Sequence, residues 1–197
     1  MKHSLVLASS SIFRRELLER LHIPFTTASP QIDESRLPEE KATDMVQRLA
    51  LAKAQALASS HPQALIIGSD QCAVLGERIL GKPGDHVHAV AQLQAASGQQ
   101  VEFLTGLCLY DSQAHTYQLA VEPFNVFFRD LSQAEIEHYL RREQPYNCAG
   151  SFKSEGLGIS LFERLAGDDP NALIGLPLIR LMAMLRHKGW VIPAPLT

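Results

Sequence analysis

The sequence predicts a mixed α/β protein in which strands and helices alternate along the chain. Three observations support this prediction: short apolar runs of strand length, longer segments with apolar residues at helical spacing, and turn residues between the two kinds of segment. With 197 residues, 46% of them hydrophobic and 20% charged, the chain has the size and composition of a soluble globular protein with a sizeable core. We therefore expect one folded unit over residues 1–197.

The elements are assigned in chain order from these patterns. The first apolar run is a predicted buried strand, and the serine cluster that follows it precedes a helical pattern. The predicted strands span residues 5–8, 25–28, 64–67, 101–110, 116–128 and 157–162, with a hairpin at residues 74–79 whose turn is Gly76-Glu77. The predicted helices span residues 11–21, 38–59, 85–96, 132–142 and 176–187. The third strand is expected to end at Gly68-Ser69-Asp70, because glycine and polar residues follow the apolar run there.

Charge and apolar content exclude several classes of protein. A net charge of -3 gives no overall attraction to nucleic acid or anionic lipid, and every apolar run is far shorter than the roughly 20 residues of a membrane span. The first residues lack the apolar region and cleavage site of a signal peptide, so we expect a cytoplasmic protein. The P-loop, dinucleotide-binding and G-x-S-x-G motifs are missing. Cys72, Cys108 and Cys148 form no C-x-x-C pair and are predicted to be small buried residues.

Two cations interrupt apolar helix faces. On the first predicted helix, Arg14 falls in the same arc as Phe13 and Leu17, close to the helix N-terminus. Such a guanidinium either binds an anion together with free backbone N–H groups or pairs with a carboxylate at the edge of the core. On the second predicted helix, Lys53 lies within the apolar stripe, where an ammonium needs a carboxylate partner or a ligand-filled cleft. The occurrence of two such residues favours a cleft.

Acidic residues lie at the predicted strand end and in the loop before the second helix. Asp70 stands where open α/β sheets place groups that contact ligands. The hairpin register pairs Gln71 with Lys82, so Lys82 is expected beside Asp70. Asp33 and Glu34 either offer an oxygen ligand to a divalent cation or are solvated surface residues. Cations that hold phosphate oxygens, together with carboxylates, are the groups that phosphoryl or nucleotidyl chemistry requires.

Several short motifs occur in an order that spans nearly the whole chain. They are Leu7-Ala8-Ser9-Ser10-Ser11 with Arg14-Arg15, Asp33-Glu34, Arg48-Leu49-Ala50 with Lys53-Ala54, Gly68-Ser69-Asp70, Gly81-Lys82-Pro83, Ala149-Gly150 and Gly175-Leu176-Pro177. Together these motifs resemble those of the Maf family of nucleotide pyrophosphatases. The resemblance implies a mixed α/β fold with two lobes flanking a cleft, related to inosine-triphosphate pyrophosphatases. It also implies metal-dependent cleavage of a nucleoside triphosphate to a monophosphate and diphosphate, and it suggests a homodimer.

The resemblance assigns roles to the residues that match the family motifs. The triphosphate is assigned to four residues: Ser9, Arg14, Lys53 and Lys82. Glu34 and Asp70 are expected to hold a divalent cation, Mg²⁺ or Mn²⁺. Asp70 is also the expected proton acceptor for the water that attacks the α-phosphorus.

Three departures from the commonest family pattern concern Phe13, Gln71 and Glu155. They resemble the subfamily that hydrolyses 7-methyl-GTP, in which these positions determine specificity. N7-methylation makes guanine cationic, which favours stacking on Phe13, and Glu155 is suited to accept hydrogen bonds from the N1–H and N2–H₂ edge. The alternative for Phe13 is packing in the core against Leu17.

Two alternative functions remain open on this evidence. The first is the same chemistry on dTTP or UTP, the other activity that the family suggests. The second is a nucleotide-binding regulator of cell division without turnover, because members of the family are also associated with septum inhibition.

Overall fold

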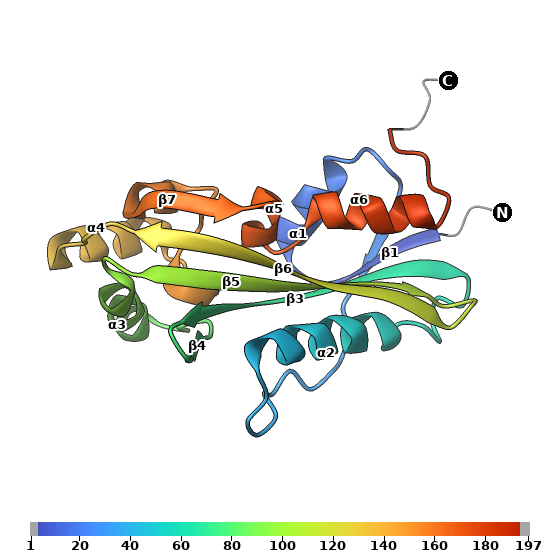
Figure 1. Cartoon of the computed structure of the whole chain (residues 1–197), viewed down its shortest axis with the longest axis horizontal. Helices are drawn as coiled ribbons and strands as arrows, with labels where there is room; N and C mark the ends of the chain where they lie inside the picture. The colour runs from blue at the N-terminus through green and yellow to red at the C-terminus, as the bar shows by residue number, and fades with distance from the viewer. Residues whose placement is uncertain (1–3, 194–197) are drawn as a thin grey trace.

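The computed structural model describes residues 4–193 and shows a long mixed sheet with helices packed against it (Figure 1). The strands are β1 (Ser4–Ala8), β2 (Thr26–Ala28), β3 (Ala64–Leu75), β4 (Arg78–Leu80), β5 (Gln100–Asp111), β6 (Thr116–Phe128) and β7 (Phe162–Gly167). The helices are α1 (Ile12–Glu19), α2 (Ala42–Gln55), α3 (His86–Ala96), α4 (Gln133–Glu143), α5 (Pro170–Ile174) and α6 (Leu178–His187), with 3₁₀ turns η1 (Ala149–Ser151) and η2 (Leu157–Leu161) between α4 and β7. The prediction of a mixed α/β fold is confirmed.

The sheet is built around three long strands, β3, β5 and β6. The strand order is β2-β1-β3-β5-β6-β7, and β4 also pairs with β3. β1 is parallel to β2 and β3, whereas the other pairs are antiparallel. The long strands run through the whole length of the molecule, so that both ends of the sheet share one hydrogen-bonded ladder (Figure 1).

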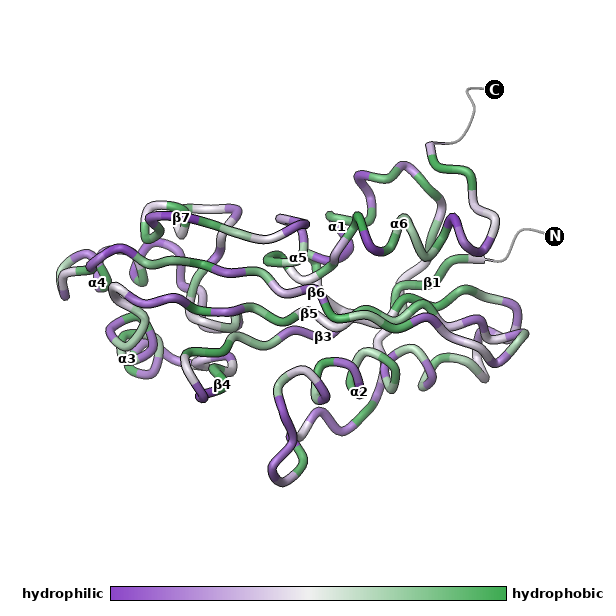
Figure 2. Tube along the Cα trace, viewed as in Figure 1, coloured by the Kyte–Doolittle hydropathy of each residue, from purple (hydrophilic) through white to green (hydrophobic). Residues whose placement is uncertain are grey.

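Alternation along β3 divides its side chains between two helical layers. Leu65 and Ile67 pack in a core with α1 and α6, whereas Ala64 and Ile66 pack in a core with α2. In Figure 2 the hydrophobic colour follows β1 and the adjacent strands, and the connection between β2 and α2 is largely hydrophilic. The same alternation continues in the middle of β3, where Asp70 contacts Lys53 of α2 and Gln71 contacts the backbone of α5.

Helix α2 lies unusually close to the sheet because glycines replace side chains beneath it. A Cβ atom on Gly68 of β3 would collide with the carbonyl oxygen of Ala50, and one on Gly106 of β5 would collide with that of Val46. This close approach brings the inner face of α2 directly over the centre of β3.

Several predicted boundaries are wrong for local reasons. β3 does not end at Gly68-Ser69-Asp70 but continues to Leu75, because β5 pairs with it throughout. The hairpin turn is confirmed, with Leu75 opposite Arg78, but the ladder ends where Leu80 pairs with Ala73. The predicted pairing of Gln71 with Lys82 therefore does not form.

The predicted helix 38–59 is shorter in the structure, and residues 157–161 of the predicted strand 157–162 are not a strand. The Arg36 guanidinium donates to the carbonyl oxygen of Glu40, which keeps this segment in a loop until α2 begins at Ala42. Residues 157–161 form η2, and only then does β7 begin. Helix α5 precedes the closing helix and was missing from the predicted elements.

Candidate functional site

A gap in the edge of the sheet creates the site. β1 pairs with β3 only as far as Ile67, and β4 pairs with β3 only from Ala73, so residues 68–72 have no strand partner on that side. The carboxyl ends of β1 and β4 point toward this gap from opposite directions. The chain after β1 supplies a serine cluster and α1, and the chain after β4 supplies Lys82. These segments surround a cavity of about 600 Å³.

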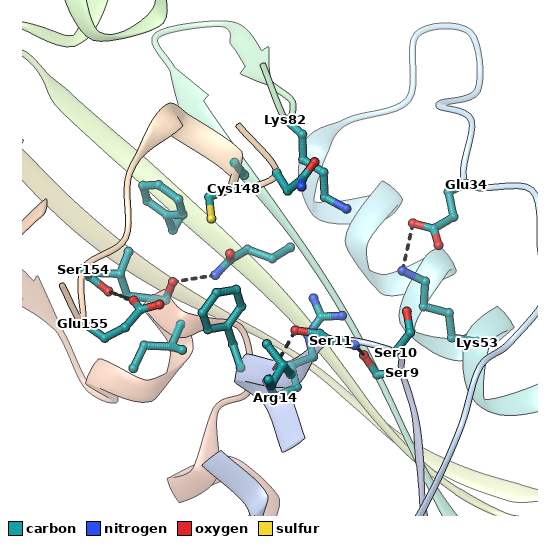
Figure 3. A pocket seen from close by; sticks show the side chains of 18 of the residues that line it. Ser9, Ser10, Ser11, Arg14, Glu34, Lys53, Lys82, Cys148, Ser154 and Glu155 are labelled. Carbon is teal, nitrogen blue, oxygen red and sulfur yellow. Dashed lines mark hydrogen bonds and ion pairs between the residues drawn. The ribbon is translucent and has the colours of Figure 1, made fainter. Parts of the chain in front are cut away.

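The cavity gathers residues that are far apart in the sequence. Of the predicted site residues, the following line it: Ser9, Phe13, Arg14, Glu34, Lys53, Gln71, Lys82 and Glu155. Asp70 is the exception: it is buried, is not part of the cavity lining, and accepts a hydrogen bond from Lys53, which does line the cavity. Figure 3 shows Lys53 and Glu34 at one end of the cavity and Ser154 and Glu155 at the other, with Arg14 and Lys82 between them.

Lys53 joins two carboxylates at the first end of the cavity. Its Nζ donates to Oδ1 of Asp70 at 2.7 Å and to Oε2 of Glu34 at 2.9 Å. The side chains of Lys53 and Asp70 are 7% and 10% exposed, whereas that of Glu34 is 55% exposed. The buried ammonium therefore has a carboxylate partner and also faces a cavity, the two circumstances that its apolar surroundings require.

Arg14 is held by the backbone at the C-terminal end of α5. Its Nε donates to the carbonyl oxygen of Gly175 at 2.8 Å, and the hydroxyl of Ser69 donates to the same oxygen at 2.8 Å. Burial lowers the pKa of the Arg14 guanidinium from its ordinary value, and the negative charges of Asp70 and Glu34 oppose that shift. Because Nε is occupied, the terminal nitrogens of this partly desolvated cation are the groups available to an anion.

The N-terminus of α1 lies beside Arg14. The hydroxyl of Ser11 caps the helix by accepting from the backbone N–H of Arg14, and the hydroxyl of Ser9 accepts from the N–H of Ser11 at 3.1 Å. The first turn of α1 carries no acidic residue. Its positive dipole end therefore adds to the cationic character of this part of the cavity.

The opposite end of the cavity is more apolar and carries acceptor groups. Phe13 is half-buried, and Phe103 and Phe152 pack edge to face with ring centroids 5.2 Å apart. Glu155 is exposed, and its Oε2 accepts from the hydroxyl of Ser154 at 3.3 Å. Gln71 lines the cavity from the centre of β3.

Some site residues lie elsewhere than the sequence predicted. Asp70 is in the middle of β3, not at its end. Asp33 does not line the cavity, because its carboxylate accepts from the N–H of Ser35 in a local turn. Cys148 is only half-buried and lines the cavity, so the prediction of a small buried residue is wrong there; it is confirmed for Cys72 and Cys108, where burial raises the pKa of each thiol to about 12.

The sequence reasoning also missed residues that the fold brings to the cavity. They include Ser29, Pro30, Phe103, Asn147, Phe152 and Ser154. The loop that carries Asn147 and Ser154 contains the Ala149-Gly150 motif, so an extension of that motif in both directions would have included them. Nothing near Phe103 in the sequence distinguishes it from an ordinary core residue.

The donor set around Lys53 is compatible with a hard divalent cation. Lys53 donates to Oε2 of Glu34 and to Oδ1 of Asp70, which leaves the second oxygen of each carboxylate for a cation beside the ammonium, and carboxylate oxygen is the ligand that Mg²⁺ and Mn²⁺ prefer. Within residues 4–193 no cluster of three or more His, Cys, Asp or Glu side chains exists that would enclose a metal. Two carboxylates fit a cation that takes its other ligands from water and substrate phosphates.

A mixed sheet whose open edge lies beneath a cationic cavity defines a protein that binds a small phosphorylated ligand. Residues 4–188 match the family described as Maf-like protein, and the chain belongs to this family. A protein of Pseudomonas fluorescens (strain Pf0-1) named 7-methyl-GTP pyrophosphatase is 60% identical over 189 residues, which cover 96% of this chain and 98% of the relative. A protein of the same name from Nitrosococcus oceani is 57% identical over 95% of this chain and 94% of the relative. Another, from Colwellia psychrerythraea, is 55% identical over 94% of this chain and 93% of the relative.

Proposed function

We propose that this chain hydrolyses 7-methyl-GTP to 7-methyl-GMP and diphosphate and so removes a modified nucleotide before it reaches RNA. The observation that carries the proposal is the position of Lys53, which lines a cavity with Arg14 and Lys82 while its ammonium contacts the buried Asp70. The name shared by the relatives supports the choice of substrate.

The cationic end of the cavity suits a triphosphate. Arg14, Lys53 and Lys82 offer positive charge from three sides, and Ser9 and the N-terminus of α1 add hydrogen-bond donors. A triphosphate bound there has its phosphates near Lys53 and its base near Glu155, because these residues lie at opposite ends of the cavity (Figure 3). The cations also stabilise charge that accumulates on the leaving diphosphate.

The reaction is an attack of water on the α-phosphorus. A bond forms between the water oxygen and phosphorus, the bond from phosphorus to the oxygen bridging to the β-phosphate breaks, and diphosphate leaves with that electron pair. The proton of the water passes to Asp70. Lys53 donates to Oδ1 of this carboxylate, so we assign the proton to the other oxygen, Oδ2.

We propose further that Glu34 and Asp70 hold Mg²⁺ or Mn²⁺ in the working enzyme. A divalent cation there would neutralise charge on the phosphate oxygens. Glu34 is the more exposed of the two carboxylates and comes from a loop, so it is the ligand that can move toward an incoming cation–nucleotide complex.

The apolar end of the cavity suits a cationic purine. Stacking of 7-methylguanine on Phe13 is worth about 2 kcal/mol where water is excluded. Glu155 accepts from the N1–H and N2–H₂ groups of the base, and its negative charge complements the positive ring. A base without those donors forgoes these hydrogen bonds and is bound less well.

The working form and location of the enzyme follow from the same proposal. The net charge of -3 and the enclosed cavity favour a small nucleotide over nucleic acid. Each helix between residues 4 and 193 is too short or too polar to cross a lipid bilayer. We propose a cytoplasmic enzyme, and a homodimer as its assembly.

A nucleotide panel tests the proposal. Diphosphate release is measured from 7-methyl-GTP, GTP, dTTP and UTP, with Mg²⁺ or Mn²⁺ and after removal of metal with EDTA. The expected result is metal-dependent turnover that is fastest on 7-methyl-GTP. The Asp70→Asn variant is expected to lose at least about 10³-fold in kcat, because it removes the proton acceptor.

The matched control is Asp44→Asn, which changes an exposed carboxyl in the first turn of α2 and should leave kcat unchanged. A preference for dTTP or UTP would contradict the substrate, and equal activity with EDTA would contradict the metal. Absence of turnover on every nucleotide would support the alternative of a binding protein.

A further inference from the structure

Gln71 is anchored by three acceptors on the face of β3 that packs against α5. Its Nε2 lies 2.7 Å from the carbonyl oxygen of Ala172, 3.1 Å from that of Leu173 and 3.0 Å from Oγ1 of Thr105. Thr105 is directly opposite Gln71 in the antiparallel pair of β3 and β5 and is fully buried. Its hydroxyl donates in turn to the carbonyl oxygen of Ala172 at 2.9 Å.

These contacts determine which end of the amide faces the cavity. Backbone carbonyl oxygens only accept hydrogen bonds, so the NH₂ group of Gln71 must face Ala172 and Leu173. The reverse orientation would set the amide oxygen against two carbonyl oxygens. The hydroxyl proton of Thr105 is used on Ala172, so its oxygen also presents a lone pair to the NH₂ group. The atom of Gln71 left for the cavity is the oxygen Oε1, which has no hydrogen-bond partner among residues 4–193.

We infer that Thr105 is a positioning residue for substrate selection: together with the carbonyl oxygens of Ala172 and Leu173 it holds the Gln71 amide so that the cavity presents a carbonyl oxygen to the base. The inference rests on the proposed function, because it concerns selection between nucleotides. A fixed carbonyl oxygen is the negative end of the amide dipole and attracts a cationic 7-methylguanine. An NH₂ group at the same place would repel the positive ring, and a freely rotating amide would favour neither base.

The inference distinguishes 7-methyl-GTP from GTP by charge. Both nucleotides present the same N1–H and N2–H₂ edge to Glu155, so that edge does not separate them. The methylated ring carries a positive charge that the unmethylated ring lacks. An oriented acceptor therefore contributes to the ratio of the two kcat/KM values rather than to turnover of nucleotides in general.

The test is a double-mutant cycle on that ratio. The kcat/KM values for 7-methyl-GTP and GTP are measured for the wild type, Thr105→Val, Gln71→Met and the double variant. Thr105→Val keeps the volume of the side chain and removes its hydroxyl, so the ratio is expected to fall about five- to tenfold, the effect of one neutral hydrogen bond. In the Gln71→Met background the same substitution should leave the ratio unchanged, because no amide remains to be positioned.

Matched variants separate positioning from general damage. Thr105→Ser keeps the hydroxyl and should restore the wild-type ratio, and Thr27→Val on the exposed strand β2 should not change it. If Thr105→Val does not fold by circular dichroism, Thr105→Ala replaces it in the cycle. The inference would be overturned if Thr105→Val left the ratio unchanged while the natural Gln71 is present. It would also be overturned if Thr105→Val lowered the ratio equally with Gln71 and with Met at that position. If the wild type does not prefer 7-methyl-GTP, the proposed function is overturned instead. The double-mutant cycle then compares kcat/KM for the nucleotide that the wild type prefers with kcat/KM for GTP.

Discussion

Lys53 holds together two carboxylates that would repel each other without it. Its ammonium contacts Asp70 and Glu34 and lines the cavity. Lys53→Met keeps a straight apolar side chain and removes the charge. We expect kcat/KM for 7-methyl-GTP to fall by about 10²- to 10³-fold, the usual effect of removing one group that stabilises developing charge, and the free energy of unfolding to fall by about 3 kcal/mol because Asp70 is left buried without a partner.

Two variants separate these causes. Lys41→Met removes an exposed lysine just before α2 and should affect neither quantity. Adding Asp70→Asn to Lys53→Met removes the stranded charge, so the double variant should unfold at higher denaturant concentration than Lys53→Met alone. Wild-type turnover in Lys53→Met would exclude a role for Lys53 in phosphate binding.

At the scale of single residues, the sequence predicted what local periodicity encodes. The helical arcs predicted that Lys53 and Arg14 interrupt apolar faces, and the structure places both at the cavity. It did not predict the partners that orient these and other side chains. Thr105 is 34 residues away from Gln71 in the sequence, and Gly175 is 161 residues away from Arg14. No local pattern specifies contacts between residues so far apart in the chain.

At the scale of elements, the loop before α2 is tied to that helix by Glu40. The Glu40 carboxylate accepts from Arg48 Nε at 2.6 Å, from Arg48 Nη2 at 2.8 Å and from the N–H of Leu37 at 3.1 Å. The hydrogen bonds from Arg48 are the main reason that the pKa of Glu40 falls to about 2. Arg48 also donates to the carbonyl oxygen of Ser35, the residue after Glu34 in the same loop.

This tie makes one part of the stability depend on pH. Because the pKa of Glu40 is depressed in the folded state, its contribution is complete above the ordinary value of 4.5 and is lost as the pH falls through about 2. The wild type should therefore melt at a higher temperature than Glu40→Gln at pH 7, and the difference should shrink between pH 4.5 and 2. Thermal melts of both proteins across this range provide the measurement; a difference independent of pH would contradict the assignment.

Element types were predicted better than element ends. The ends of β5 and β6 are within a residue of the prediction, because long apolar strands end at clear polar turns. Residues 157–162 were mistaken for a strand because Leu157, Ile159 and Leu161 alternate with other residues, as on a half-buried strand. In the structure only Leu161 is buried, and the carboxylate of Glu143 binds the N–H of Leu157 to start a 3₁₀ turn.

At the scale of the whole molecule, the cavity lies over a sheet that is continuous from end to end. β3 and β5 pair from Leu65 with Asp111 to Val74 with Glu102 without interruption. A hinge through the cavity would have to break this ladder. Nucleotide binding should therefore leave the radius of gyration unchanged within error, as measured by small-angle X-ray scattering of Asp70→Asn with saturating 7-methyl-GTP. A clear contraction on binding would show that the two ends of the sheet do close on each other.

The order of strands in this sheet was not predictable from periodicity alone. β1 and β4 approach the same edge of β3 from opposite ends, and the gap between them depends on where each strand stops. Gly68-Ser69-Asp70 resembled a strand end in the sequence, because a glycine there is typical of a turn. The sequence does not distinguish such a glycine from one that lets a helix pack closely on a strand. Only the packing of α2 distinguishes the two cases.

The short segment from α5 to Gly175 serves as a common reference for both ends of the substrate. The carbonyl oxygen of Gly175 accepts from Arg14, which we propose to bind the phosphates, and those of Ala172 and Leu173 accept from Gln71, which we propose to face the base. The two anchors lie within residues 172–175, at the end of α5 and its cap. In the proposed binding mode this short stretch of backbone sets the spacing between the phosphate and base subsites. In that mode, both the length and the charge of a nucleotide are matched to groups that one short piece of main chain holds in place.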